Sequence, residues 1–310
     1  PTIQAGIEAA GPGDTVLVSE GIYYEQISFL GKKPLTVASL FLTDGDTTHV
    51  RQTVIDGSLI PDVLNASVVE FISGEDTTSI LCGFTIRGGK GTVYTTERYS
   101  FRGGGGISVY NSGAKITKNR ITGNHLSDTL PGQPQIVTGA GLEVRWFENS
   151  NWVVAEYNTV DHNSTLCGGL EASGAGMMIP CNARIECNVF EGNTCTATGN
   201  ANALAGGLGC WANKIWPVSL TALVSNNLFE GNSCQSVIGF ANTSAVYLNG
   251  VLSILSGNEV SGNQVSTNTT VGGGAAILLW APLEGSVARN NHFAGNTGNL
   301  WTGGLHLETD

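Results

Sequence analysis

The chain has 310 residues, of which 41% are hydrophobic and only 13% are charged, and its formal net charge at pH 7 is −11. It contains 43 glycines, about twice the usual share of ~7%, which argues against a compact helical fold and favours many short strands joined by tight turns. No run of 18 or more apolar residues occurs, so we predict no membrane insertion, and we expect no nucleic-acid partner.

Residues 1–27 read "PTIQAGIEAAGPGDTVLVSEGIYYEQI", and they are followed by "TVIDG" at 53–57 and "LCGFTIRGG" at 81–89. These segments resemble the N-terminal cap and early coils of right-handed parallel β-helix proteins of the pectate-lyase-like superfamily. The resemblance implies an amphipathic helix that covers the open end of the coil, with Ile3, Ile7 and Ala10 facing the first coil. It also implies that Val16 and Val18 begin the first strand.

A repeat follows in which small residues precede an apolar-x-apolar strand, as in "GGGGISV" ending at Val109 and "GAGLEV" ending at Val144. The first apolar residues of these strands recur at intervals of 28 to 38 residues: Ile107, Leu142, Met177, Leu208, Val246, Ile277 and Leu305. Such variable intervals are typical of stacked coils, in which insertions lie in the turns and not in the strands. Within one strand the period is two, because Leu142 and Val144 share one face.

Three short strands per unit with no helix between them predict an all-β fold, a single-stranded right-handed parallel β-helix with an N-terminal amphipathic helix cap. We expect one domain over residues 1–310, in which 1–30 form the cap and first coil and 31–310 form the stacked coils, with about nine or ten coils in all. The sequence stops at Asp310 in mid-repeat, so we expect that further coils or another domain follow it.

A second motif, Asn-x-apolar-x-x-Asn, occurs six times, for example as "NVFEGN" from Asn188 and "NLFEGN" from Asn227. Its apolar residues should stack as one inward column made of Ile121, Val160, Phe190, Phe229, Val260 and Phe293. Its first asparagines should form a ladder at a bend, since each amide can both donate to and accept from its neighbours: Asn119, Asn158, Asn188, Asn227, Asn258 and Asn291. Glycines such as Gly123 and Gly192 would supply positive φ at the next corner.

Two of the seven cysteines, Cys195 and Cys234, end the near-identical segments "CNVFEGNTC" and "NNLFEGNSC". At equal positions in adjacent coils their Cα atoms should lie ~5 Å apart, within the range of a disulfide. We therefore favour a Cys195–Cys234 disulfide, with a ladder of buried thiols as the alternative. The sequence contains neither a C-x-x-C pair nor a close Cys–His cluster, so it predicts no zinc site.

Catalytic motifs of the pectate-lyase-like superfamily do not transfer to this chain, because the strings that characterise polygalacturonases, pectin methylesterases and mannuronan epimerases are absent. Clustered aspartates of calcium-dependent lyases are absent as well. One acidic column, Asp161, Glu191 and Glu230, could bridge a calcium ion, although solvated carboxylates are the commoner outcome. We expect no cofactor other than this possible calcium.

Residues 87–145 hold eight of the fourteen basic residues and only three acidic ones. Such a basic zone could hold an acidic polysaccharide, although solvated faces on an early coil are the favoured explanation. If the zone is the site of a polysaccharide lyase, Arg145 or Lys118 would abstract the proton and Tyr110 or His125 would protonate the leaving oxygen. Lys115 and Arg120 would then neutralise the uronate. Glu143 beside Arg145 argues against this assignment, because an ion pair raises the pKa of the base.

The outward residues of the glycine-preceded strands form two unusual columns. One holds Tyr110, Arg145, Pro180, Trp211, Asn249 and Trp280, and the other holds Ser108, Glu143, Met178, Gly209, Tyr247, Leu278 and His306. Large apolar patches are rare on monomers, so Glu143, Trp211, Tyr247 and Trp280 are candidate ligand-binding residues. In the alternative, the connections 126–138 and 196–204 fold over these strands and cover them.

Together these features lead us to expect a secreted or cell-surface protein that binds carbohydrate or serves as an interaction module without catalysis. Two alternatives stay open. One is a polysaccharide lyase that acts on an acidic polysaccharide. The other is a structural subunit of an adhesin, stalk or extracellular filament. The expected partners are a polysaccharide or another surface protein, and self-association could use the aromatic strip or the open end of the coil.

Overall fold

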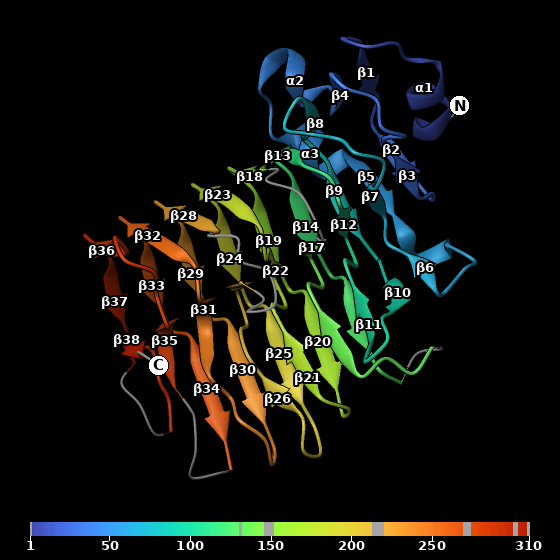
Figure 1. Cartoon of the computed structure of the whole chain (residues 1–310). Helices are drawn as coiled ribbons and strands as arrows, with labels where there is room; N and C mark the ends of the chain where they lie inside the picture. Colours follow the sequence, from blue (N-terminus) through green and yellow to red (C-terminus); the bar gives the residue numbers. More distant parts are fainter. Residues whose placement is uncertain are drawn as a thin grey trace.

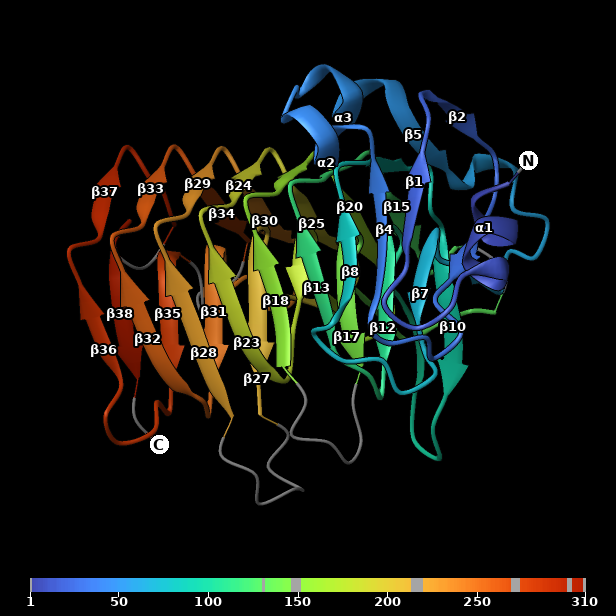
Figure 2. The same ribbon diagram turned by 90° about the horizontal axis from the view of Figure 1, so that it is seen from above.

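The structure is a computed structural model that describes residues 2–129, 132–145, 152–212, 220–268, 274–299 and 303–308. Short strands stack side by side from the N-terminal end to the C-terminal end of the molecule (Figures 1 and 2). Most of them pair in parallel with the strand one repeat earlier and the strand one repeat later. The fold is therefore all-β, and its stacked parallel sheets fit the predicted parallel β-helix.

Three sheets, A, B and C, each contain nine strands in the described residues and surround the main core. Sheet A consists of β1 (Thr15–Val18), β4 (Leu35–Ser39), β8 (Ser79–Cys82), β13 (Ala114–Thr117), β18 (Trp152–Glu156), β23 (Asn182–Glu186), β28 (Thr221–Ser225), β32 (Leu252–Ser256) and β36 (Val287–Arg289). Sheet B consists of β2 (Gly21–Tyr23), β5 (Thr53–Asp56), β9 (Thr85–Arg87), β14 (Arg120–Thr122), β19 (Thr159–Asp161), β24 (Val189–Glu191), β29 (Leu228–Glu230), β33 (Glu259–Ser261) and β37 (His292–Ala294). Sheet C consists of β3 (Ile27–Ser28), β7 (Val69–Phe71), β12 (Ile107–Tyr110), β17 (Leu142–Arg145), β22 (Met177–Met178), β27 (Leu208–Trp211), β31 (Thr243–Asn249), β35 (Ala275–Trp280) and β38 (Leu305–Glu308).

Two smaller sheets, D and E, are formed by the segments that connect strands of sheet B to strands of sheet C. Sheet E consists of β15 (His125–Ser127), β20 (Ser164–Cys167), β25 (Thr194–Ala197), β30 (Ser233–Ser236) and β34 (Gln264–Thr267). Sheet D consists of β6 (Asn65–Ala66), β10 (Gly91–Thr95), β11 (Ser100–Gly103), β16 (Ile136–Thr138), β21 (Glu171–Ser173) and β26 (Asn202–Ala203). Within sheet D, β10 is antiparallel to β6 and β11. Small side chains such as Ala172 and Cys195 fill a second core here.

Four short helical segments lie near the N-terminal end: α1 (Ile3–Ala9), α2 (Phe41–Asp44), α3 (Thr48–Gln52) and the 3₁₀ turn η1 (Gly57–Leu59). The hydroxyl of Thr2 accepts a hydrogen bond from the Ala5 amide at 3.1 Å and so satisfies one free amide of the first turn of α1. Ile3 and Ile7 of α1 are buried in the main core, on the apolar face expected from the sequence.

The predicted inward column and the predicted asparagine ladder are both confirmed. The rings of Phe190 and Phe229 are stacked with their centroids 4.6 Å apart. Each ladder asparagine from Asn119 to Asn258 donates its backbone and side-chain N–H groups to the amide oxygen of the next one, at 2.8–3.3 Å. These bonds satisfy polar groups that would otherwise cost a few kcal/mol on burial.

A second ladder, which the sequence analysis missed, uses the last asparagine of each motif: Asn124, Asn163, Asn193, Asn232, Asn263 and Asn296. Its amides also donate to backbone carbonyls of the preceding rung, as Asn193 does to Val160 at 2.8 Å. The motif therefore places one ladder before and one ladder after each of the six strands of sheet B that carry it, β14 to β37. The identical spacing of the two asparagines in all six copies was the signal for it.

The glycines that precede the strands of sheet C make room for this second ladder. A Cβ at Gly176 would lie 2.5 Å from the carbonyl oxygen of Gly207 and 3.3 Å from the side-chain nitrogen of Asn193. A Cβ at Gly141 would meet the carbonyl oxygen of Gly176 at 2.3 Å. Close backbone approach between rungs thus explains why small residues open each repeat.

The predicted disulfide is not present. Cys195 and Cys234 are in register in adjacent strands, as expected, but both are free and buried. The thiol of Cys195 donates a hydrogen bond to the carbonyl oxygen of Ala172 at 3.1 Å, so the thiol has a polar partner although it forms no disulfide. Burial raises the pKa of the Cys234 thiol well above its usual value. The structure therefore matches the alternative, stacked buried thiols.

We predict that Gly176→Ala destabilises the protein by about 1–3 kcal/mol, because the added methyl group must displace the next rung. Chemical denaturation measures this loss. Gly304→Ala is the control, since a Cβ at Gly304 meets nothing within 4 Å, and it should change stability by less than about 0.5 kcal/mol. Equal stability of both variants would contradict close rung contact at the glycine column.

Candidate functional site

The residues of the predicted basic zone are distributed over several faces of the molecule. Lys115 is on sheet A and Lys118 follows it in the turn to sheet B. Arg120 is on sheet B, His125 is on sheet E, and Tyr110 and Arg145 are on sheet C. The lyase constellation proposed from the sequence is therefore not assembled in one place. Only Lys115 with Lys118, and Tyr110 with Arg145, are neighbours.

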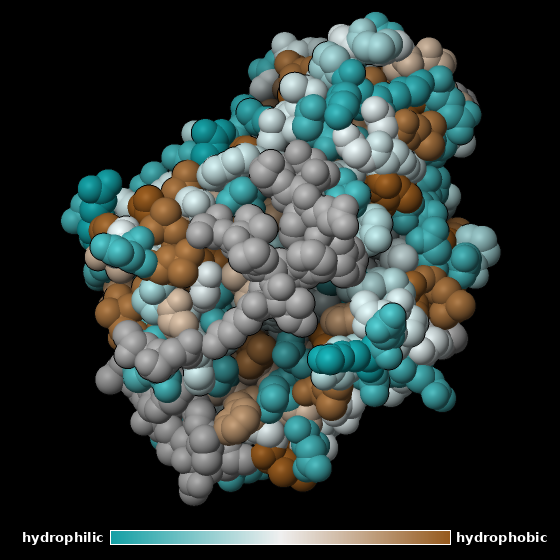
Figure 3. Space-filling view, viewed as in Figure 1, coloured by the Kyte–Doolittle hydropathy of each residue, from teal (hydrophilic) through white to brown (hydrophobic). Residues whose placement is uncertain are grey.

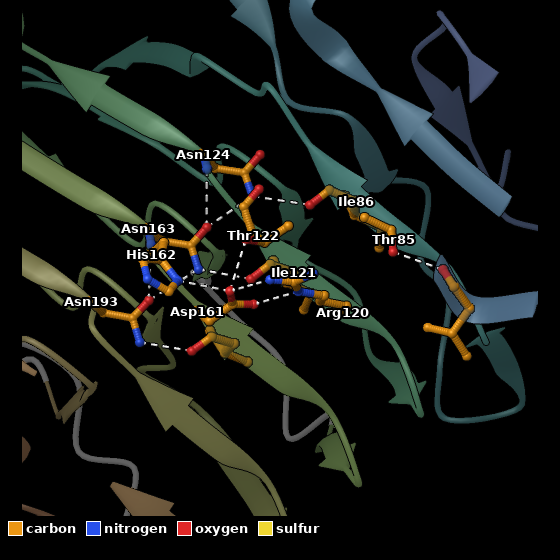
Figure 4. A network of polar contacts seen from close by, with 12 residues as sticks. Thr85, Ile86, Arg120, Ile121, Thr122, Asn124, Asp161, His162, Asn163 and Asn193 are labelled. Atoms are coloured by element: carbon orange, nitrogen blue, oxygen red, sulfur yellow. Dashed lines mark hydrogen bonds and ion pairs between the residues drawn. The ribbon is translucent and has the colours of Figure 1, made fainter. Parts of the chain in front are cut away.

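Arg120 is held by a carboxylate rather than presented to a substrate (Figure 4). Its Nε and Nη2 atoms donate to the two oxygens of Asp161 at 3.0 and 2.8 Å, and the Thr122 hydroxyl donates to the same carboxylate at 3.0 Å. His162 Nδ1 lies 2.8 Å from Asp161 Oδ2. Burial opposes ionisation of Asp161, but these partners outweigh it and hold the pKa of its carboxyl below its usual value.

The predicted acidic column is in register, since Asp161 pairs with Glu191 and Glu191 pairs with Glu230. Asp161 turns to Arg120, however, and Glu191 and Glu230 are exposed. In the described part of the chain, no group of three or more His, Cys, Asp or Glu side chains is arranged to hold a metal ion. His125 contacts the Ser164 hydroxyl through Nδ1 at 2.5 Å, away from the other predicted catalytic residues.

The two outward columns of sheet C are confirmed in register. Tyr110 pairs with Arg145 and Ser108 with Glu143, while Trp211, Asn249 and Trp280 follow one another on β27, β31 and β35. These side chains point away from the main core, toward the corner at which sheet C meets sheet D. We call this region the C/D corner. It is defined by the outward residues of sheet C and by the face of sheet D that points away from sheet E.

Near β17, the C/D corner contains a buried ion pair covered by aromatic rings. Arg145 Nη2 donates to Glu143 Oε2 at 2.5 Å, and the Tyr94 hydroxyl donates to Glu143 Oε1 at 3.2 Å. The guanidinium lies against the ring of Tyr94, which is itself stacked on Phe101 with centroids 5.1 Å apart. Burial raises the pKa of Glu143 and lowers that of Arg145, and the close contact between the two groups offsets part of this cost.

Several buried polar atoms of this corner have no hydrogen-bond partner among the described residues. They are Thr138 Oγ1, Arg145 Nη1 and Glu171 Oε1. The Ser173 hydroxyl lies beside the Glu171 carboxyl and interacts with it. Thr138, Glu171 and Ser173 lie on adjacent strands of sheet D. Their positions alternate with those of the residues that fill the second core between sheets D and E. Because nearly all buried polar groups in proteins are paired, such a cluster indicates a place for water or a polar ligand.

Farther along the stack, the corner is apolar. Met178, Tyr247 and Leu278 are only 2%, 5% and 0% exposed, so the strip expected to be open surface is covered at these positions. Leu204 and Ala205, which follow β26, pack on Tyr247 and Leu278. The connection over residues 196–204 therefore covers the strip in part, as in the alternative considered from the sequence.

Trp211 and Trp280 are half-exposed at the edge of this apolar cluster. The Trp211 ring meets the Tyr247 ring edge-on with centroids 6.1 Å apart. The Tyr247 hydroxyl accepts a hydrogen bond from Asn249 Nδ2 at 2.9 Å. Tyr110 is 43% exposed near the other end of the column. Figure 3 shows one face of the molecule, on which hydrophobic and hydrophilic residues are mixed.

Sequence reasoning missed the hairpin of β10 and β11, which brings Tyr94 and Phe101 over Arg145. The segment "TVYTTERYSFR" at 92–102 carries β-branched and aromatic residues on both sides of a polar turn, which is the ordinary signal of a hairpin. Glu171 was missed because it stands outside both repeated motifs.

No family model, curated protein or solved structure matches this chain. Among the described residues, no helix has both the length and the apolar character needed to cross a membrane.

We predict a pH dependence of stability that originates at Glu171. Burial raises the pKa of its carboxyl from an ordinary 4.5 to about 7. Because the folded-state pKa is the higher one, the protonated carboxyl contributes stability below pH 4.5, and this contribution is lost as the pH rises through about 7. Glu171→Gln, which cannot ionise, should therefore show a smaller fall in Tm between pH 5 and pH 8 than the wild type.

Differential scanning calorimetry across this pH range measures the effect. Glu230→Gln, at an exposed position of sheet B, is the matched control and should keep the wild-type slope. An unchanged slope in Glu171→Gln would show that the carboxyl is solvated, and the cluster of unpaired polar atoms would then lose one member.

Proposed function

We propose that the protein binds an oligosaccharide or polysaccharide along the outer face of sheet C. The observation that carries the proposal is the column in which half-exposed Trp211 and Trp280 flank Asn249. Rungs of a parallel sheet are spaced by about 4.8 Å, so the two indole rings are about 10 Å apart along the stack. Flat rings at regular intervals can each cover the apolar face of one sugar, while polar groups between them bond to hydroxyls.

The polar part of the C/D corner supports the same proposal. Unpaired atoms of Thr138 and Glu171 offer both a donor and acceptors, as sugar hydroxyls require. The aromatic cover of Tyr94 and Phe101 adds apolar surface beside them. We infer that a sugar chain contacts this edge of the corner and continues along the tryptophan column.

Binding without catalysis is favoured over the lyase alternative. A lyase needs an accessible base beside an acid and a cationic group that neutralises the uronate. Arg145 is only 8% exposed and its guanidinium already contacts Glu143 and Tyr94. Lys118, His125, Lys115 and Arg120 lie on other faces.

Two further features belong to this proposal. From the resemblance of the N-terminal segments, we propose that the coil is right-handed, that α1 covers its open end, and that the protein is related to the pectate-lyase-like superfamily. Such proteins commonly work outside the cell, so we also propose an extracellular or surface location. A structural role in an adhesin, stalk or filament is the alternative, in which the stack would serve as a spacer.

We predict that Trp211→Ser and Trp280→Ser each weaken the binding of an oligosaccharide selected on a glycan array by about tenfold, because each removes one stacking ring. Isothermal titration calorimetry measures the affinity. Trp152→Ser is the matched control: Trp152 is 38% exposed but lies on β18 of sheet A, and its replacement should leave the affinity unchanged.

Four outcomes would argue against carbohydrate binding without catalysis at sheet C. The array could detect no glycan, or the Trp152 variant could lose as much affinity as the other two. Release of unsaturated products that absorb in the near ultraviolet, from pectate, alginate or a glycosaminoglycan, would establish the lyase instead. Growth of particle size with concentration in light scattering would favour the structural subunit.

A further inference from the structure

A pocket of about 280 Å³ lies on the outer face of sheet A, on a different side of the stack from the C/D corner. Its floor consists of outward residues from consecutive strands: Thr15, Thr36, Ile80 and Lys115 in one column, and Cys82, Thr117 and Glu156 in the next. Leu42 of α2 forms a wall, and Lys118 follows β13 at the rim. Its volume is close to the lower end of the range for small-molecule sites.

The pocket has one positive charge without a carboxylate partner. Lys115 is neutralised by Glu156, whose Oε1 lies 2.8 Å from its Nζ, and Glu156 also pairs with Arg184 at 3.1 Å. The Lys118 ammonium instead lies 5.3 Å from the centroid of the Phe41 ring, and it has no carboxylate within 4 Å in the described residues. An anion that entered the pocket would therefore meet two ammonium groups but only one carboxylate.

A second observation points to a ligand. Thr117 lines the pocket and is only 7% exposed, yet its Oγ1 has no hydrogen-bond partner in the described structure. A buried hydroxyl that is left unpaired costs about 1–3 kcal/mol, which a bound acceptor would recover. Ile80 and Leu42 supply apolar surface beside it.

The geometry points to a binding site for a small organic anion that has an oxyanion head and an apolar body. We infer that the head accepts hydrogen bonds from Lys118 Nζ, Lys115 Nζ and Thr117 Oγ1, while the body packs on Ile80 and Leu42. The same chemistry is offered by a carboxylate and by a phosphate monoester. This site is independent of the proposed carbohydrate surface, because the two share no residue.

The conformation of Lys118 provides a conservative variant. Lys118 has a φ of 58°, and the same corner of later rungs is occupied by Asn226 and Asn290 with φ values of 55° and 54°. Asparagine tolerates this left-handed conformation well. Lys118→Asn should therefore remove the ammonium and keep the turn, which its melting temperature can confirm.

The test is a calorimetric titration with benzoate, phenyl phosphate and the neutral analogue benzyl alcohol. Benzoate or phenyl phosphate should bind at least about tenfold more tightly than benzyl alcohol, and Lys118→Asn should remove most of this preference. Thr117→Val should weaken the anion severalfold without affecting benzyl alcohol. The stronger of the two anions identifies the natural head group as carboxylate or phosphate.

Tyr157→Asn is the matched control, since Tyr157 occupies the equivalent corner one rung later, with a φ of 56°, and does not line the pocket. It should bind the anion as the wild type does. The inference is overturned if neither anion binds at millimolar concentration, if benzyl alcohol binds as tightly as they do, or if correctly folded Lys118→Asn retains the full preference.

Discussion

The rest of the structure depends on the two asparagine ladders, which hold the rungs from β14 to β37 directly over one another. In the second ladder, Asn193 donates from its backbone and side chain to Asn232 and also to the Val160 carbonyl, so one residue fixes three strands. The side-chain hydrogen bonds from Asn119 to Asn258 and from Asn124 to Asn263 are buried, and breaking one would leave a polar group without water. Register is therefore specified by polar bonds as well as by apolar columns, and every surface column follows from it.

Because neighbouring rungs are so alike, positions that depart from their column stand out. His162 has a φ of 54° at a corner where Gly123, Gly192 and Gly231 occupy the adjacent rungs. This left-handed backbone conformation is less favourable for histidine than for glycine. The His162 side chain makes a contact with Asp161 that a glycine could not make. Glu143 likewise interrupts a column of Ser108 and Met178, and Arg145 follows Tyr110 in the adjacent column. The repeated residues build the scaffold, and the exceptions supply the charge and the aromatic surface from which the proposed sites are built.

Much of the fold could be predicted from the sequence. Residues one repeat apart lie over one another, so the spacing between motifs determines which side chains are neighbours. The stacking of Phe190 on Phe229 and the ladder from Asn119 are direct consequences of repeated motifs. The candidate site was harder to predict, because the segments that cover sheet C lie outside the repeat. The hairpin that carries Tyr94 and the connection that carries Leu204 bury residues which alternation alone places on the surface. Spacing likewise brought Cys195 beside Cys234, but it could not show that a carbonyl group already satisfies the thiol.

A double-mutant cycle on the second ladder tests the central claim, register through asparagine bonds, most directly. The cycle combines Asn193→Ala with Asn232→Ala, which are bonded neighbours, and a parallel cycle combines Asn124→Ala with Asn263→Ala, which have three rungs of the ladder between them. The account predicts a coupling energy of about 0.5–3 kcal/mol for the neighbours and additivity within about 0.5 kcal/mol for the distant pair. Additive effects in the neighbouring pair would contradict it.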